Sequence, residues 1–115
     1  VYDTSVNIVA AFEAEKFGAG DADEAREKTH RYLNCDLLIM DDLGTEMMTS
    51  LVASALYTII NTRLVSGKKT VINSNLTPEE LEKRYPPQIV SRLEGEYLPL
   101  TFIGSDIRLI KRDMM

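Results

Sequence analysis

Residues 35–46 read CDLLIMDDLGTE, and this stretch decides the fold class of the chain. Four consecutive apolar residues, 37–40, run directly into two carboxylates, Asp41 and Asp42. A continuous apolar run bounded by polar residues is typical of a strand that is covered on both faces, as in a parallel sheet. Two acids at the carboxyl end of such a strand lie where α/β proteins bind their ligands.

The acidic pair has the pattern of a Walker B motif. In that motif the first acid orders a magnesium ion, and the second prepares a water molecule to attack a phosphate. A buried strand that merely runs out into an acidic turn explains the same residues. The stretch by itself leaves both readings open.

The composition is that of an ordinary globular domain. The 115 residues suffice for one domain, and 44% of them are hydrophobic and 27% charged. No apolar stretch approaches the roughly eighteen residues of a membrane span, no basic signal region follows Val1, and the single Cys35 cannot form an internal disulfide. These features indicate a cytoplasmic protein.

The net charge of −5 argues against a nucleic-acid surface over the whole chain, but it leaves open a local basic patch that binds nucleic acid.

Helix and strand signals alternate along the chain. Capping residues and apolar spacing predict a short helix over 88–94 and helices that begin near Asp3 or Thr4, Asp21 or Asp23, Thr49 or Ser50, and Thr77. Strands are predicted at 1–2, 37–40, 69–73 and 97–103. The alternation predicts an α/β fold with a largely parallel sheet. On the long helix after Ser50, Arg63 is expected on a solvated face, with a position facing a neighbouring protomer as the alternative.

Three further residues are candidates for chemistry. Asn75 follows the strand at 69–73, and its amide can orient a water and contact a terminal phosphate oxygen; alternatively it caps the turn before Thr77. Arg92 lies at the edge of an apolar helix face, from which it can reach a nucleotide on a neighbouring subunit, or it is a solvated charge. Arg108 is a candidate phosphate contact, or it forms a salt bridge with a nearby acid.

The order of these elements resembles the AAA+ ATPases of the DnaC-type helicase loaders and their IstB-like relatives from transposons. The resemblance covers nearly the whole chain and looks like the loader branch in particular, through the phrases DLLIMDDLGTE, TVINSNLTPEEL, IVSRLEGEY and GSDIRLIKR. It implies a P-loop NTPase (AAA+) fold with a three-layer α/β/α core and a mostly parallel sheet. Residues 1–115 would then form the C-terminal part of a single ATPase domain, from Walker B to the second sensor.

Carried over by position, the resemblance assigns Asp41 to magnesium, through a water, and Asp42 to the attacking water. Asn75 matches the first sensor, Arg92 the arginine finger that acts on the next protomer's ATP, and Arg108 the second sensor on its own protomer's ATP. The implied cofactors are ATP and Mg²⁺. The implied partners are a replicative DNA helicase, single-stranded DNA and further copies of the protein through the Arg92 interface, without a membrane.

The chain departs from the family pattern in two places. Many AAA+ proteins end the acidic strand in Asp-Glu, whereas Asp42 is one methylene shorter, which is compatible with a slow switch ATPase. No G-x-x-x-x-G-K-[ST] loop is present, because 18–20 lacks a lysine and 67–70 opens a strand rather than a helix. In the family this loop and its strand lie upstream of the segment that matches Val1. We therefore expect a fragment without the P-loop strand, with an exposed sheet edge beside 97–103 and no useful affinity for ATP.

Three functions stay open on these grounds. The parent protein is an ATP-dependent loader of the replicative helicase, an IstB-like transposition helper ATPase, or a degenerate AAA+ interaction module that has lost the nucleotide. The first two imply that the parent hydrolyses ATP, while the fragment alone is expected to be inactive.

Overall fold

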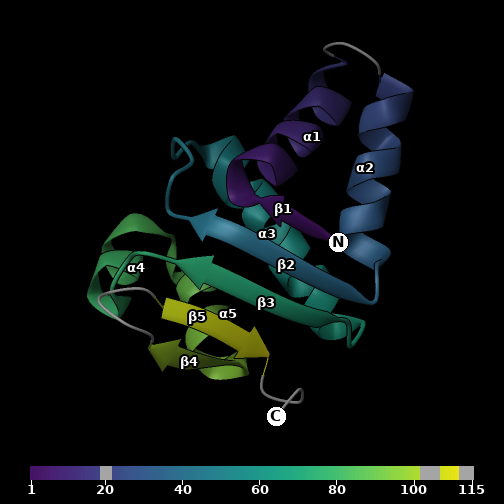
Figure 1. Cartoon of the computed structure of the whole chain (residues 1–115). Coiled ribbons are helices and arrows are strands. Elements are labelled where there is room, and N and C mark those ends of the chain that lie inside the picture. The colour runs from purple at the N-terminus through teal and green to yellow at the C-terminus, as the bar shows by residue number, and fades with distance from the viewer. Residues whose placement is uncertain (19–21, 102–106, 112–115) are drawn as a thin grey trace.

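A five-stranded sheet with the order β1-β2-β3-β5-β4 organises the chain (Figure 1). The structure is a computed structural model that describes residues 1–18, 22–101 and 107–111, with residues 98–101 and 107–111 described by their backbone. The elements in chain order are β1 (Tyr2–Thr4), α1 (Ser5–Phe17), α2 (Ala22–Asn34), β2 (Leu37–Leu43), α3 (Ser50–Val65), β3 (Lys69–Ser74), α4 (Pro78–Arg84), α5 (Pro87–Glu96), β4 (Tyr97–Thr101) and β5 (Ile107–Lys111).

Side-chain caps fix the starts of three helices where the sequence predicts them. Thr4 Oγ1 accepts a hydrogen bond from the backbone N–H of Asn7 at 3.1 Å, and Thr49 Oγ1 accepts one from Val52 at 3.1 Å. Thr77 forms the predicted capping box with Glu80 at the start of α4. These bonds satisfy backbone donors that have no partner inside the helix, so local sequence is sufficient to set these boundaries.

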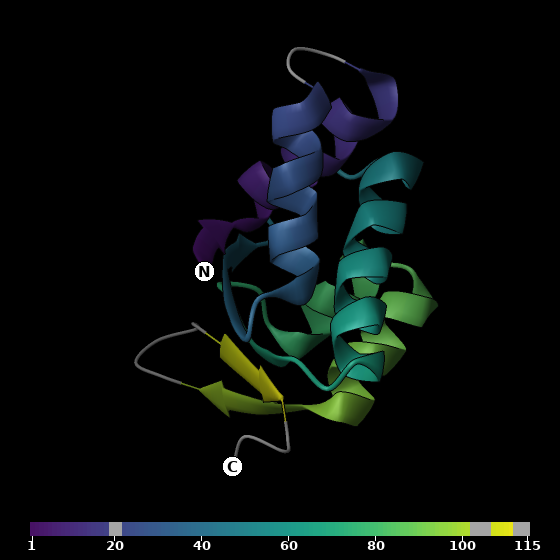
Figure 2. The same ribbon diagram turned by 90° about the vertical axis from the view of Figure 1, so that its right-hand side faces the viewer.

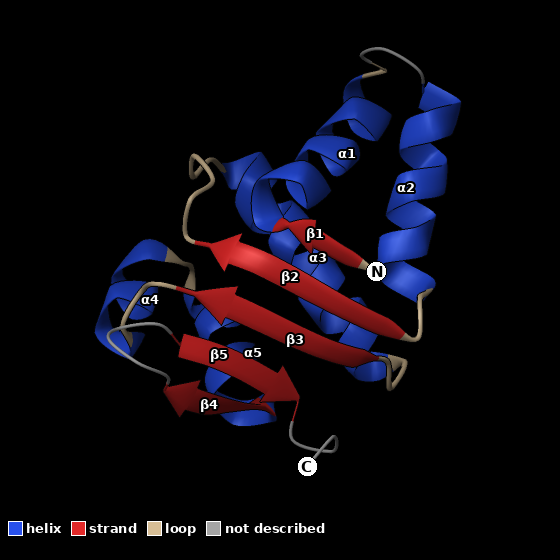
Figure 3. Ribbon diagram, viewed as in Figure 1, coloured by secondary structure: helices blue, strands red, loops and turns tan. Residues whose placement is uncertain are grey.

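The strands form a mixed sheet. β1, β2 and β3 pair in parallel, β5 pairs antiparallel with β3, and β4 pairs antiparallel with β5. β4 therefore runs in the same direction as β3, and the connection through α4 and α5 passes over the position that β5 occupies (Figure 3). The predicted α/β class and the parallel pairing of the first three strands are confirmed.

The neighbour that 97–103 was expected to lack is present for the part of that segment which the structure describes, and β4 is the outer strand of the sheet. β4 pairs along its length with β5, which the sequence did not predict as a strand. The pairing satisfies the backbone N–H and C=O groups on the side of β4 that faces β5, while the opposite side of β4 forms the edge of the sheet. Residues 102 and 103 of the predicted strand lie outside the described residues, as do residues 104–106.

The described helices cover one face of the sheet (Figures 1 and 2), so the predicted three-layer arrangement is not what these residues form. The chain moves from β1 to β2 to β3 in one direction, and right-handed crossovers then place every connecting helix on the same side. Burial follows this arrangement, because Leu38, Met40 and Ile72 are fully buried while Leu37 on the other face is 38% exposed. The apolar run 37–40 is thus covered on one face, not on both.

The hydrophobic core lies between the sheet and this helical layer. Its residues include Ile8 and Val9 of α1, Leu56, Ile59 and Ile60 of α3, and Ile89 and Leu93 of α5. Among the residues that the structure describes, no helix is long and apolar enough to cross a membrane.

Candidate functional site

The two acids of the 35–46 stretch lie at the carboxyl end of β2, as the sequence predicts. Asp41 is partly buried, and its carboxylate accepts hydrogen bonds from groups on both neighbouring strands. The Tyr2 hydroxyl of β1 donates to Oδ2, and the Asn73 amide of β3 donates to Oδ1 at 3.3 Å. The backbone N–H of Asp42 also donates to Oδ1, at 3.0 Å. The strands on either side therefore fix the orientation of the Asp41 carboxylate.

Asp42 is exposed at the point where β2 leaves its regular register with β3. The register shifts between Met40 and Leu43, and Asp42 has a φ of 59°, in the left-handed region. Aspartate tolerates this conformation better than most residues do, but it still costs on the order of 1 kcal/mol. The left-handed conformation interrupts the regular backbone of β2 at Asp42, and hydrogen bonds in the following turn must hold it.

The turn after Asp42 requires a glycine. Gly44 has a φ of 111°, and a Cβ atom at this position would lie 2.6 Å from Leu76 Cδ1. The carbonyl oxygen of Asp42 accepts hydrogen bonds from the Thr45 hydroxyl at 2.8 Å, the Thr45 backbone N–H at 3.2 Å and the Ser5 hydroxyl at 3.1 Å. The glycine lets the chain pass close to Leu76, and the three donors fix the direction of the turn.

Asn73 contacts Asp41, the first acid of the pair, and sequence reasoning missed it. Asn75, the predicted first sensor, is exposed and lies just beyond the end of β3. Asn73 lies within β3, and its Oδ1 atom is buried without a hydrogen-bond partner in the described structure. The sequence contained a signal for this contact. Asn73 lies two residues after Val71, so both side chains lie on the same face of β3. Val71 pairs with Ile39, which lies two residues before Asp41 on β2.

The two predicted arginines lie in different parts of the fold. Arg92 is a partly exposed residue of α5, beside the buried Ile89 and Leu93, so its predicted place at the edge of an apolar face is confirmed. Arg108 belongs to β5, where its backbone position is paired with Asn73. Its side chain, and the residues 104–106 that precede it in the predicted motif, lie outside what the structure describes. Backbone register alone therefore brings the position of Arg108 to the strand that neighbours the acids.

The oxygen atoms at and beside Asp41 are the kind of ligand that a hard cation prefers. Magnesium prefers oxygen ligands and keeps several of its waters, and both the Asp41 carboxylate and the unpartnered Oδ1 of Asn73 are oxygen atoms that can accept from such waters. No group of three or more His, Cys, Asp or Glu side chains is placed to hold a metal within the described ranges. Asp41 and Asn73 thus fit an ion held through water and by a second molecule such as a nucleotide.

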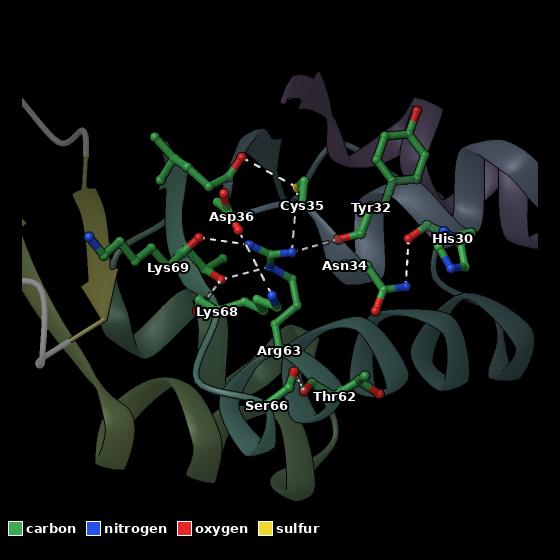
Figure 4. Close-up of polar contacts among 12 residues, drawn as sticks. His30, Tyr32, Asn34, Cys35, Asp36, Thr62, Arg63, Ser66, Lys68 and Lys69 are labelled. Carbon is green, nitrogen blue, oxygen red and sulfur yellow. Dashed lines mark hydrogen bonds and ion pairs between the residues drawn. The ribbon is translucent and has the colours of Figure 1, made fainter.

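Arg63 occupies a site that the sequence did not predict. Its side chain is 0% exposed, so the expectation of a solvated face is wrong. The guanidinium donates to Thr70 Oγ1 at 2.9 Å, to the carbonyl oxygens of Tyr32 at 2.9 Å and Lys69 at 2.8 Å, and to Cys35 Sγ at 3.5 Å (Figure 4). Burial lowers the pKa of Arg63 from its ordinary value. The fixed fork of five donors lets one side chain join α2, α3 and β3.

Comparison of the chain with protein-family models, with curated proteins and with solved structures gives no match. The resemblance to helicase loaders therefore rests on the motifs and their order along the chain. The geometry around Asp41 is an independent observation, because it does not depend on that resemblance.

Proposed function

We propose that this chain is part of the ATPase domain of a helicase loader, in which Asp41 and Asp42 form the Walker B pair. One observation carries the proposal. Two acids end a strand of the parallel sheet, and the first of them faces an amide from the adjacent strand, with Asn73 Nδ2 3.3 Å from Asp41 Oδ1. The amide contact holds the Asp41 carboxylate in one orientation at the strand end, which supports this reading over a buried strand that merely ends in an acidic turn.

The acids take different roles in this proposal. Asp41, held by donors from both sides, orders magnesium through a water. Asp42 is exposed, projects from the turn and positions the water that attacks the terminal phosphate. Asn73 or Asn75 acts as the first sensor, and Arg108 as the second.

Arg92 acts on a neighbouring subunit in the same proposal. The helical layer that carries α5 lies on one side of the sheet (Figure 2). Asp41 has the same parity along β2 as the exposed Leu37, which places it on the face opposite the helices. An arginine placed in this way is poorly located for its own protomer's nucleotide and is suited to one bound next door. Assembly would then couple ATP to the grip of the loader on single-stranded DNA and to delivery of the replicative helicase.

The sheet position between β3 and β4 also supports the proposal. The chain passes over this position when it runs from β3 to β4, and only the later β5 fills it. In the family that the motifs resemble, the P-loop strand lies beside the strand of the first sensor, and this is the position that β5 occupies here. A longer protein with a P-loop strand would need to displace β5 from β3. We refer to this longer protein as the full-length protein.

The same strand favours one alternative. If β5 holds this position in the full-length protein too, no room is left for a P-loop strand, and the chain is a non-catalytic interaction module with an AAA+ fold. Calorimetry with MgATP separates these possibilities. Residues 1–115 alone are expected not to bind at micromolar concentrations, since the phosphate cradle is missing, whereas the full-length protein binds only if the ATPase proposal holds.

The decisive test is hydrolysis by two variants of the full-length protein. Asp42→Asn should greatly lower kcat and leave nucleotide affinity nearly unchanged, because a carboxylate that positions water acts mainly in the transition state. Asp41→Asn should weaken MgATP binding as well. Turnover at the parent rate in both variants would rule out the Walker B assignment.

A further inference from the structure

Glu46 is a buried carboxylate that lies next to the acidic turn and outside the predicted site. It follows β2 in the loop that leads to α3, and its side chain is 4% exposed. Burying a carboxylate is costly unless hydrogen bonds replace its water. The groups that donate to Glu46 therefore indicate what its side chain is held against.

Three donors from separate segments meet at this carboxylate. The Ser5 hydroxyl at the start of α1 donates to Oε2 at 2.7 Å, and the backbone N–H of Gly44 donates to the same oxygen at 3.1 Å. The Tyr85 hydroxyl, at the end of α4, donates to Oε1. Hydrogen bonds to a charged acceptor are roughly twice as strong as neutral ones, so the carboxylate holds all three segments together.

Two of these donors connect Glu46 to Asp42. The Ser5 hydroxyl lies 3.1 Å from the carbonyl oxygen of Asp42 as well as 2.7 Å from Glu46. Gly44 is two residues from Asp42, in the same turn. Glu46 thereby restrains the segment in which Asp42 adopts its left-handed φ of 59°.

The third donor connects Glu46 to the junction between α4 and α5. Tyr85 is buried at the C-terminal end of α4, two residues before the start of α5. The neighbouring Arg84 donates to the backbone carbonyl of Glu46, and its guanidinium carbon lies 5.7 Å from the centre of the Tyr85 ring. α5 is the helix that carries Arg92. A displacement of the α4–α5 junction is therefore transmitted to the Asp42 turn through the Glu46 carboxylate.

We infer that Glu46 is a positioning residue that couples the Asp42 turn to the α4–α5 junction. Through Gly44 and Ser5 it sets the backbone from which Asp42 projects, and through Tyr85 it fixes that backbone relative to the helix of Arg92. The coupling itself follows from the contacts of Glu46. Its consequence for hydrolysis rests on the proposed function.

Amide hydrogen exchange in residues 1–115 tests the coupling without any nucleotide. Tyr85→Phe keeps the buried ring and removes one donor from Glu46. It should speed exchange of the Gly44 N–H about fivefold, the effect of weakening one ordinary hydrogen bond. Tyr32→Phe is the matched control, because Tyr32 is another buried tyrosine whose hydroxyl donates to a carboxylate, that of Asp3, at 2.6 Å. This control should leave exchange at Gly44 unchanged.

Ser5→Ala provides a second variant that acts from the other side of Glu46, and it too should speed exchange at Gly44. Equal rates at Gly44 in the parent, Tyr85→Phe and Ser5→Ala would overturn the coupling. The same result in Tyr32→Phe as in Tyr85→Phe would also overturn it, since the effect would then be general loosening of the fold.

Turnover of the full-length protein tests the positioning role separately. Tyr85→Phe should lower kcat with an unchanged KM for ATP, a split that a loss of stability alone does not produce. Faster exchange at Gly44 with an unchanged kcat would make Glu46 structural and overturn the positioning role. If Asp42→Asn and Asp41→Asn both hydrolyse ATP like the parent, the proposed function fails instead, and the exchange result alone decides the coupling.

Discussion

Asn73 and Asp41 face each other across the β2–β3 pair, with the amide Nδ2 of Asn73 3.3 Å from Oδ1 of Asp41. The other amide atom of Asn73, Oδ1, is buried and has no hydrogen-bond partner in the described structure. A buried acceptor without a partner is costly, and here it lies beside the one carboxylate to which the motif assigns a metal ion. Such an oxygen is suited to accept a hydrogen bond from a water or from a substrate that arrives with the ion.

The pair of asparagines gives a direct comparison of two sensor assignments. In the full-length protein, Asn73→Ala should lower kcat about tenfold, the effect of losing one hydrogen bond to a charged or reacting group. Asn75→Ala, the matched control at an exposed position of the same strand end, should have a smaller effect. Single-turnover ATP hydrolysis by the two variants is the measurement. A large loss in Asn75→Ala alone would support the position that the motif predicts and reduce Asn73 to a structural contact.

Local signals in the sequence were sufficient for much of the fold. Thr77 caps the helix that it was expected to cap, and Thr4 and Thr49 are each one of the two residues expected at their helix starts, because capping depends on residues three positions apart. The pairing of β5 with β3 could not be predicted in this way, since it depends on which edge of the finished sheet stays open. The one-sided covering of β2 likewise follows from the direction of the crossovers and not from the strand's own residues.

The misassigned side chains have a different cause. Arg63 lies three residues after Ile60 and four after Ile59, so the helical period already placed it on the buried face of α3. Its charge was the reason to expect solvent, and only the tertiary structure supplies the carbonyl oxygens that make burial tolerable. Glu46 gave no periodic signal because it lies in a loop, and its three donors come from segments about forty residues away on either side or from its own turn.

Removing the Arg63 guanidinium should strongly destabilise the chain. Arg63→Met keeps much of the buried volume but leaves Thr70 Oγ1 and the carbonyl oxygens of Tyr32 and Lys69 without their donor. A loss of about 3 kcal/mol in the free energy of unfolding is expected, from about 1–3 kcal/mol for each unsatisfied buried group with partial relaxation. Urea denaturation measures it. Arg31→Met, on the exposed face of α2, is the control and should change stability by less than about 0.5 kcal/mol. An equally stable Arg63→Met chain would show that apolar packing can replace the polar network.

The buried tyrosines should make the chain sensitive to alkali. Burial raises the pKa of Tyr97 from 10.0 to about 12, and burial with a neighbouring carboxylate also raises the pKa values of Tyr32 and Tyr85. A raised tyrosine pKa means that the folded state favours the neutral phenol. This contribution to stability is complete below pH 10 and is lost as the pH rises toward the folded pKa.

Tyr97 alone should contribute about 2–3 kcal/mol to this loss between pH 10.0 and about 12. Tyrosinate absorbance and circular dichroism should therefore change together as the chain unfolds. Tyr97→Phe should show a smaller fall in unfolding free energy over the same range. If Tyr97 ionises while circular dichroism stays native, its hydroxyl is accessible and the burial of this ring is wrong.

The assignment of Arg92 to a neighbouring subunit can be tested by mixing two inactive full-length proteins. Arg92→Ala should still bind nucleotide as an isolated protomer but lose the hydrolysis that depends on assembly, because the missing charge is supplied to the next subunit's ATP. Such a finger contributes roughly 10³–10⁵ in rate where chemistry limits turnover, and a slow switch ATPase gives less.

Asp42→Asn is inactive for a different reason, since it lacks its own water-positioning carboxylate. In a mixed assembly, some interfaces combine an intact Arg92 from one subunit with an intact Asp42 from the next, so part of the activity should return. Arg108→Ala is the matched control, because a second sensor acts on its own protomer's ATP and no protomer in the mixture with Asp42→Asn has both groups. Absence of rescue in the Arg92 mixture, with mixed assembly shown by native mass spectrometry, would make Arg92 an ordinary charge at the edge of α5.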